Sequence, residues 1–124
     1  MKKVICAILF LVVMCTVITS CAPSTAETRT IQNQLVGTWV EDTGTISYWY
    51  VFTPDWGFCQ ITSLPNGGAS HETMRGTYEI GAKNIKLKCD DGNTYKRPYH
   101  YNKSTSILMS VSGLKKVSSD YDLY

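Results

Sequence analysis

Turn signals recur along most of this 124-residue chain, and they constrain its fold more than any other feature. Most combine Gly, Pro, Asn or Asp, which supply the φ angles that tight hairpins require. They occupy residues 42–44, 54–57, 65–68, 81–84, 90–93, 101–104 and 112–113, roughly every 9 to 14 residues. No window between them shows the apolar period of an amphipathic helix of about ten residues, so the pattern predicts an all-β domain.

The segments between the turns are rich in aromatic and β-branched residues, which suit a pleated, half-buried surface. They predict eight strands, over residues 35–40, 45–53, 58–64, 72–80, 85–89, 94–101, 106–111 and 114–117. Short strands joined by tight turns form an antiparallel meander. A twisted sheet of this size protects its edges most easily by closing, so we expect a small eight-stranded antiparallel barrel.

Four segments, taken together, resemble the sequence pattern of a known family. Residues 35–39, Leu-Val-Gly-Thr-Trp, resemble the Gly-x-Trp opening of lipocalins, and residues 50–58 resemble the Phe-Thr-Pro-Asp-Gly hairpin of small bacterial lipocalin-like domains. Residues 76–80 and 85–87 are similar to the next two strands of those domains. Trp56 departs from the pattern, because it separates the Asp and Gly that are usually adjacent, and this leaves the turn type open.

Gly37 and Trp39 are the structural signature of this resemblance. In the family, the Trp closes one end of the barrel and the opposite mouth can admit an apolar ligand. Strand alternation predicts a large set of inward side chains: Ile46, Tyr48, Tyr50, Phe52, Phe58, Tyr78, Ile80, Ile85, Leu87, Ile107 and Met109. So many large side chains leave little empty volume in a barrel of short strands, so a transported ligand is not the default expectation.

The first 21 residues have the layout of a secretory signal peptide that ends in a cysteine. Two lysines precede an apolar run over residues 4–18, and Thr19 and Ser20 precede Cys21. This layout resembles the lipobox of bacterial lipoproteins, in which the cysteine receives a diacylglycerol and becomes the first residue of the mature chain, so palmitate is among the expected acyl groups. Two alternatives stay open. An uncleaved membrane anchor would need about 20 apolar residues, and a plain secreted product would need a better small-x-small cleavage site.

The lipoprotein resemblance implies a signal peptide over 1–20. The residues after it lack an apolar period and predict a flexible tether over 21–34, followed by a lipocalin-like barrel over 35–118 and a tail over 119–124. The formal charge of +2 comes from Lys2 and Lys3, since the other ten Lys and Arg balance ten Asp and Glu. A mature chain without a basic surface is not expected to bind nucleic acid. We expect a monomer held by a lipid on Cys21 at the extracytoplasmic face of the cell membrane.

Residues that carry enzymatic chemistry are present but do not form a known pattern. His71 and His100 lie in no metal-ligand spacing, and no Ser lies in a Gly-x-Ser-x-Gly elbow. The acidic pair at 90–91 precedes Gly-Asn and is typical of a solvated hairpin turn. We therefore expect no catalytic residues, no metal site and no cofactor, and we expect that the protein is not an enzyme.

Cys59 and Cys89 are the two cysteines left for the folded domain, and alternation separates them. If Phe58 points inward, Cys59 points outward, whereas Cys89 follows Ile85 and Leu87 inward. Two thiols on opposite sides of a barrel wall cannot meet the geometry of a disulfide. We therefore predict that both are free thiols.

An aromatic stretch on the sixth predicted strand is a candidate contact surface, through Tyr95, Arg97, Tyr99 and Tyr101. Tyr and Arg are common anchors of binding sites. Pro98 cannot donate a ladder hydrogen bond, so it predicts a bulge or a strand edge there. The alternative is a strand that turns Tyr95, Arg97 and Tyr99 inward at the barrel mouth.

Two classes of function remain. The first is a lipid-anchored, lipocalin-like module of the cell envelope that binds a small apolar ligand or a glycan. The second is a protein-interaction module, such as the small barrels that inhibit lysozymes or proteases. An open apolar cavity would favour the first class, and a filled barrel with an exposed aromatic loop would favour the second.

Overall fold

A computed structural model describes residues 24–64 and 70–124 of the chain. The predicted signal peptide, Cys21 and the whole of the predicted turn at 65–68 lie outside the described residues. The eight predicted strands are confirmed, with bounds within a few residues of those expected. They are β1 Gly37–Asp42, β2 Ser47–Phe52, β3 Gly57–Ser63, β4 His71–Ile80, β5 Asn84–Cys89, β6 Thr94–Asn102, β7 Ile107–Val111 and β8 Lys115–Ser118.

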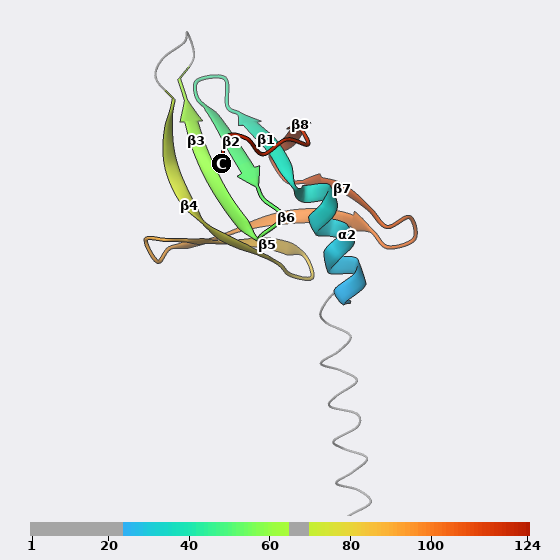
Figure 1. The fold of residues 1–124 in the computed structure, drawn as a ribbon. Coiled ribbons are helices and arrows are strands. Elements are labelled where there is room, and N and C mark those ends of the chain that lie inside the picture. The colour runs from blue at the N-terminus through green and yellow to red at the C-terminus, as the bar shows by residue number, and fades with distance from the viewer. Residues whose placement is uncertain (1–23, 65–69) are drawn as a thin grey trace, which may run out of the picture.

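The strands form one antiparallel sheet that curls into a nearly closed barrel (Figure 1). The order is β7-β6-β5-β4-β3-β2-β1-β8, so consecutive strands pair with one another from β1 to β7, while β8 pairs with β1 and not with β7. The last two strands are therefore the two edges of the sheet. Across that seam the only strand bridge among the described residues joins Val111 to Leu114.

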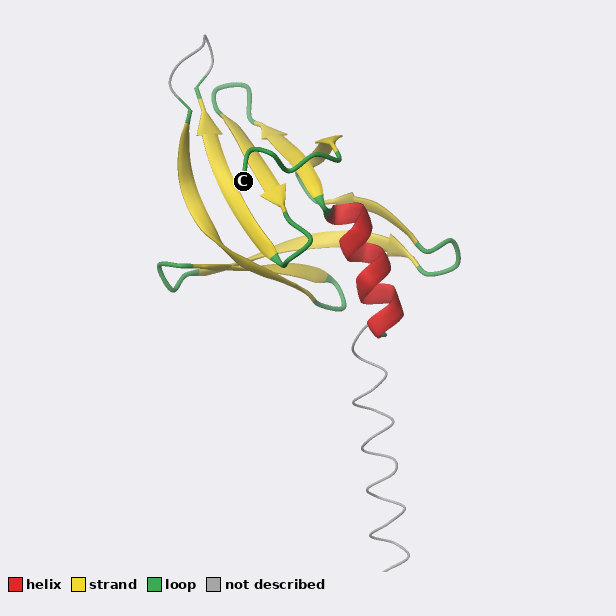
Figure 2. Cartoon of the chain, in the orientation of Figure 1, coloured by secondary structure: helices red, strands yellow, loops and turns green. Residues whose placement is uncertain are grey.

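A short helix, α2, spans Thr25–Leu35 and packs against the barrel (Figure 2). The prediction of a flexible tether up to residue 34 is therefore wrong over this helix. Ser24 caps it, because its Oγ accepts a hydrogen bond from the Glu27 N–H at 3.2 Å. Ile31 and Leu35 have no exposed surface and belong to the barrel core, so the folded domain begins before residue 35. None of the helices within 24–64 and 70–124 has the length and apolarity needed to cross a membrane.

Large side chains fill the barrel interior, as the alternation predicted for β2 to β5. Phe52 and Tyr78 meet edge to face with ring centroids 5.2 Å apart, and Tyr50 stacks on Phe52 at 6.5 Å. The other buried members of this core are Ile31, Leu35, Trp39, Phe58, Ile85, Leu87, Cys89, Leu108, Val111 and Leu114. Tyr48 and Ile80 pack against this core partly buried, while Ile46 is half-buried in the turn before β2.

The inward prediction is wrong on β7. Ile107 and Met109 are 48% and 58% exposed, and Leu108 and Val111 are buried instead. The cause is a β-bulge: His100 pairs with Ser110 and Tyr101 pairs with Leu108, so Met109 is an extra residue without a partner. One extra residue reverses the alternation of the side chains beyond it.

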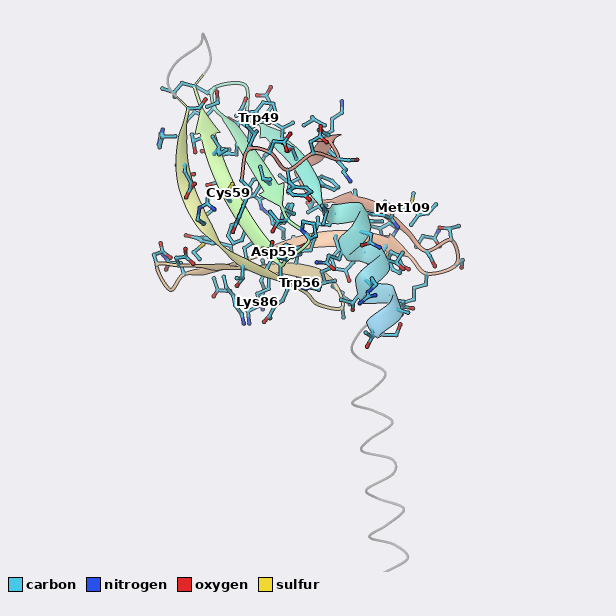
Figure 3. All side chains as sticks on the ribbon, viewed as in Figure 1. Trp49, Asp55, Trp56, Cys59, Lys86 and Met109 are labelled. Carbon is cyan, nitrogen blue, oxygen red and sulfur yellow. The ribbon has the colours of Figure 1, made fainter. Side chains whose placement is uncertain are left out.

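Residues 119–124 cross the outer face of β2 and β3 (Figures 1 and 3). Val51 and Cys59 point out of the barrel and yet have no exposed surface. Tyr124 lies on this face, where its ring is 4.3 Å from the Arg75 guanidinium and its main-chain oxygen accepts a hydrogen bond from Arg75 Nη2 at 3.2 Å. Asp120 is fixed by a 2.7 Å bond that its carbonyl accepts from Thr38 Oγ1. The predicted tail is thus a packed strap over the sheet.

The cysteine prediction is confirmed. Cys59 lies under the strap on the outer face, Cys89 belongs to the interior core, and both are free thiols. Burial raises the pKa of the Cys59 thiol. Cys89 donates to the sulfur of Met74 at 3.7 Å inside the barrel.

Candidate functional site

The signature residues lie where strand β1 leaves the helix. Trp39 is 5% exposed, and its Nε1 donates to the Leu35 carbonyl at 2.8 Å, which ties the end of α2 to the barrel. Gly37 has a φ of 137°, and a Cβ at this position would lie 2.3 Å from the Ser118 carbonyl oxygen. Both residues thus shape the helix-capped end of the barrel.

The four predicted binding residues all lie on β6, but the structure does not bring them together into one site. Tyr95 is 47% exposed near the end of the barrel that is opposite the helix. Tyr99 donates its hydroxyl hydrogen to the Gly81 carbonyl at the helix-capped end, and Tyr101 packs half-buried against the core. The sequence predicts a bulge or a strand edge at Pro98, but β6 lies inside the sheet and the nearby bulge is on β7, where Met109 is the extra residue opposite His100 and Tyr101.

Arg97 turns into the barrel mouth, as the alternative interpretation of this strand predicted. Its Nη2 donates to the Tyr50 hydroxyl at 2.7 Å and lies 2.7 Å from the Glu41 carboxylate. Burial of the guanidinium lowers its pKa, but the Tyr50 bond and the attraction of Glu41 outweigh burial, so the pKa is raised overall. Arg97 therefore stays charged and is held by neighbours on two other strands.

A polar network continues from Arg97 across the mouth. Gln60 Nε2 donates to the Tyr50 hydroxyl at 2.6 Å, and Gln60 Oε1 accepts from Thr73 Oγ1 at 2.7 Å. Thr62 and Thr73 share a further hydrogen bond of 3.0 Å. The sequence analysis missed this network, although Gln60 gave a signal: it is a polar residue two places after Phe58, hence at an inward position.

One buried acceptor in this network has no hydrogen bond. Glu41 Oε2 is buried and lies close to Arg97 Nη2, but it accepts no hydrogen bond from any described residue. The contact between Glu41 and Arg97 is thus a close, partly buried ion pair.

The Trp56 hairpin at the helix-capped end resolves the turn that the sequence left open. Trp56 takes a φ of 68°, the left-handed conformation that Gly or Asn usually supplies in such turns. Its ring packs on Tyr78 with centroids 5.2 Å apart. Trp56 and Tyr78 line a shallow surface pocket of about 540 Å³, together with Thr28, Thr77, Glu79 and Ile80.

A groove of about 560 Å³ opens at the seam between the two edge strands. Trp39, Leu108 and Leu114 are its buried apolar residues, and the exposed Met109 of β7, labelled in Figure 3, also lines it. The remaining lining residues are polar or basic: Asn33, Gln34, Ser110, Lys115 and Lys116. Sequence reasoning missed the groove because it expected a closed barrel wall.

A second surface pocket of about 440 Å³ lies beside the strap on the outer face. Trp49, Ile61 and Leu123 give it apolar walls, and His71 lies at its rim next to Glu72. Glu72 forms an exposed ion pair of 2.7 Å with Arg75, which lowers the pKa of its carboxyl group.

The fold and these sites define a small antiparallel barrel with a filled interior, a helical cap, a polar mouth and an open seam. No protein-family model, no curated protein and no solved structure matches this chain. The lipocalin-like and lipoprotein resemblances therefore stay predictions of the sequence.

Proposed function

We propose that this protein is a lipid-anchored protein-interaction module of the cell envelope, whose barrel binds a partner protein with its outer surface. The filled interior carries this proposal. Tyr50, Phe52, Phe58 and Tyr78 are each at most 2% exposed and occupy the centre of the barrel. A lipocalin that carries an apolar ligand needs that volume to be empty. Lysozymes and proteases of the envelope are the partner classes to test first.

The anchor part of the proposal rests on Cys21 and on the helix that follows it. Helix α2 begins at Thr25, four residues after Cys21. Four residue steps span at most about 14 Å, so a lipid on Cys21 would hold the helix-capped end close to the bilayer. The barrel mouth and the seam would then stay accessible to envelope proteins. Two acyl chains hold a protein far more firmly than one.

Metabolic labelling with a fatty-acid analogue tests the anchor. We expect label on the full chain, no label on Cys21→Ser, and full label on the control Cys59→Ser. Equal label on the chain and on Cys21→Ser would contradict lipidation at this residue.

Photo-crosslinking in intact cells tests the interaction module. A photoreactive phenylalanine analogue is placed, one variant at a time, at the exposed residues Tyr95, Met109 and Ile107 of the full chain. We expect crosslinks to another protein from at least one position, and no saturable uptake of an apolar fluorescent probe by the purified domain. Saturable probe uptake, with no crosslink from any position, would replace this function with apolar-ligand binding.

A glycan or another small hydroxyl-bearing ligand at the mouth is the second candidate function. The charge pair of Arg97 and Glu41 is the observation that favours it, because these two side chains stay 28% and 26% exposed at the mouth. Hydroxyl groups of a glycan can exchange hydrogen bonds with such carboxylate and guanidinium groups. Glycan-array binding that is lost in Glu41→Gln but kept in Asp42→Asn, an exposed neighbour, would support this candidate.

A further inference from the structure

The seam between β7 and β8 presents two strand edges that no other strand covers within the described residues. Apart from the Val111–Leu114 bridge, these edges face a groove and not a partner strand. Exposed edges carry unpaired N–H and C=O groups, which are the template for adding another strand. The question is what kind of group this edge accepts.

The side-chain amide of Gln34 shows which groups this edge binds, because it contacts the β7 edge as a main-chain amide would. Its Nε2 donates to the Ser106 carbonyl at 2.8 Å, and its Oε1 accepts from the Leu108 N–H at 2.7 Å. A C=O of one residue and the N–H two residues on are the pair that a neighbouring parallel strand engages. The edge is therefore oriented to receive amide groups from the groove side.

The carboxamide of Gln34 fills only the first such position. Because the N–H and C=O of a strand residue point to the same side, the Leu108 carbonyl also faces the seam. From there the groove runs past Met109 and Ser110 towards the Val111–Leu114 bridge. The β7 edge between Gln34 and that bridge comprises residues 108–110, which corresponds to roughly three residues of an extended segment at about 3.3 Å per residue.

The residues that line the groove favour particular side chains on such a segment. Its apolar residues, Trp39, Leu108 and Leu114, can take an apolar side chain at alternate positions of the segment. Its charged lining residues are the two lysines of β8, and none of its lining residues is acidic. Lys116 is held by a 2.6 Å bond from its Nζ to the Gln34 carbonyl oxygen, while Lys115 is exposed. An acidic flank on the segment would complement this charge.

We propose that the β7–β8 seam binds an extended segment of a partner protein by strand addition, with an apolar side chain in the groove and an acidic residue next to Lys115. This proposal rests on the protein-interaction function and names the site and the class of partner segment.

Peptide selection followed by N-methylation tests the proposal. A display library of linear twelve-residue peptides is selected against the folded domain, residues 24–124, in a form that carries the full strap and helix. The best binder is then synthesised with N-methyl groups on alternate amides, in the two possible frames. We expect one frame to weaken the Kd by about tenfold or more and the other to have little effect, because only alternate amides face a strand edge.

Two matched pairs of variants place the peptide on the molecule. Met109→Glu should weaken the Kd by about tenfold, while Ile107→Glu should not, since both residues lie half-exposed on β7 but only Met109 lines the groove. Lys115→Glu should weaken peptides with an acidic flank, and Lys103→Glu, in the turn before β7, should not. Circular dichroism and thermal melting establish that each variant is folded.

The proposal is overturned if no selected peptide loses affinity in Met109→Glu, or if both N-methylated frames bind as tightly as the parent. Concentration-dependent dimers of the domain that Met109→Glu abolishes would overturn it in favour of a second copy of the chain. Crosslinks in cells from Tyr95 alone, without a seam-binding peptide, would leave the interaction function standing and remove this site. A seam-binding peptide without any crosslink in cells would support the site and contradict the cellular function.

Discussion

Single residues determine how closely neighbouring strands of this barrel can approach, and Gly76 is the clearest case. It lies on β4 opposite Phe58 of β3 and Cys89 of β5. A Cβ at this position would be 1.9 Å from the Lys88 carbonyl oxygen, so only Gly allows the two strands to approach so closely. We expect Gly76→Ala to lower the free energy of unfolding by about 3 kcal/mol or more, near the upper end for overpacking, in urea denaturation.

Gly81→Ala is the comparison for this variant. It lies in the turn after β4, where the nearest atom to a new Cβ is the Asn84 carbonyl oxygen at 3.1 Å. A small shift of the turn relieves that contact, so its cost should be clearly smaller. Equal effects of the two variants would mean that the β4–β5 approach at Gly76 is not tight.

Because of Tyr78, we expect the stability of the barrel to decrease as the pH rises in the alkaline range. Burial raises the pKa of its hydroxyl to about 12, with a Gln32 bond acting in the opposite direction. Because the folded pKa exceeds the ordinary value of about 10, the stabilisation is complete below pH 10 and is lost as the pH rises towards 12. We expect the free energy of unfolding to fall by about 3 kcal/mol across this range, at 1.4 kcal/mol per pKa unit.

Denaturation curves of two phenylalanine variants at a series of pH values check this prediction. Tyr78→Phe removes the titrating group together with its 2.8 Å bond to the Thr53 carbonyl, so its stability should be lower at neutral pH but flatter above pH 10. Tyr95→Phe, at an exposed site, should keep the slope of the parent chain. A steep slope that persists in Tyr78→Phe would assign the pH dependence to other tyrosines.

At the residue scale, the sequence predicted what depends on strand alternation and missed what depends on distant partners. The outward Cys59 and the inward Arg97 both follow from counting along a strand. The partner of Arg97 could not be predicted, because Glu41 lies 56 residues earlier and meets it only after the sheet curls. The same holds for the pairing of Gln60 with Tyr50 and Thr73.

Among the elements, helix α2 shows most clearly where the sequence was insufficient. Thr25–Leu35 is polar along most of its length, with Ile31 and Leu35 as its only large apolar residues. Two apolar residues four places apart cannot hold an isolated helix, and most helical stability in proteins comes from packing. The helix forms because these two residues cap the barrel core. The sequence alone has no signal for that contact.

A substitution on each face of α2 tests this explanation. Ile31→Ala should lower the free energy of unfolding by about 2 to 5 kcal/mol, the usual cost of truncating a buried Ile. Arg29→Ala, on the exposed face of the same helix, should change it by less than about 0.5 kcal/mol. A tether would tolerate both changes equally, so similar values measured by urea denaturation would restore the tether interpretation.

For the whole molecule, turn spacing predicted the number of strands and the meander, but not the state of the seam. Closure depends on whether the first and last strands of the sheet meet. Here a bulge at Met109 in β7 and a register shift opposite Thr38 in β8 both alter the pairing near the seam. A bulge cannot be seen in an alternating sequence, because the extra residue looks like any other exposed position. The groove at the seam therefore could not be predicted from the sequence.

The strap, which consists of residues 119–124, covers part of the outer face of the barrel, and replacing the strap should expose that face to solvent. Replacing these residues with a Gly-Ser segment of the same length would uncover Val51 and Cys59, which are fully buried on the outside of the barrel. In the parent chain, burial raises the pKa of the Cys59 thiol, so little reactive thiolate is present, and the buried sulfur is not accessible to reagents.

We expect alkylation of Cys59 by iodoacetamide at pH 8 to be at least about tenfold faster in the chain with the replaced strap than in the parent chain. Cys89, inside the core, should keep its slow rate, and Cys59→Ser in the replaced chain should abolish the fast reaction. An unchanged rate, measured by mass spectrometry, would show that the strap is not what protects this thiol.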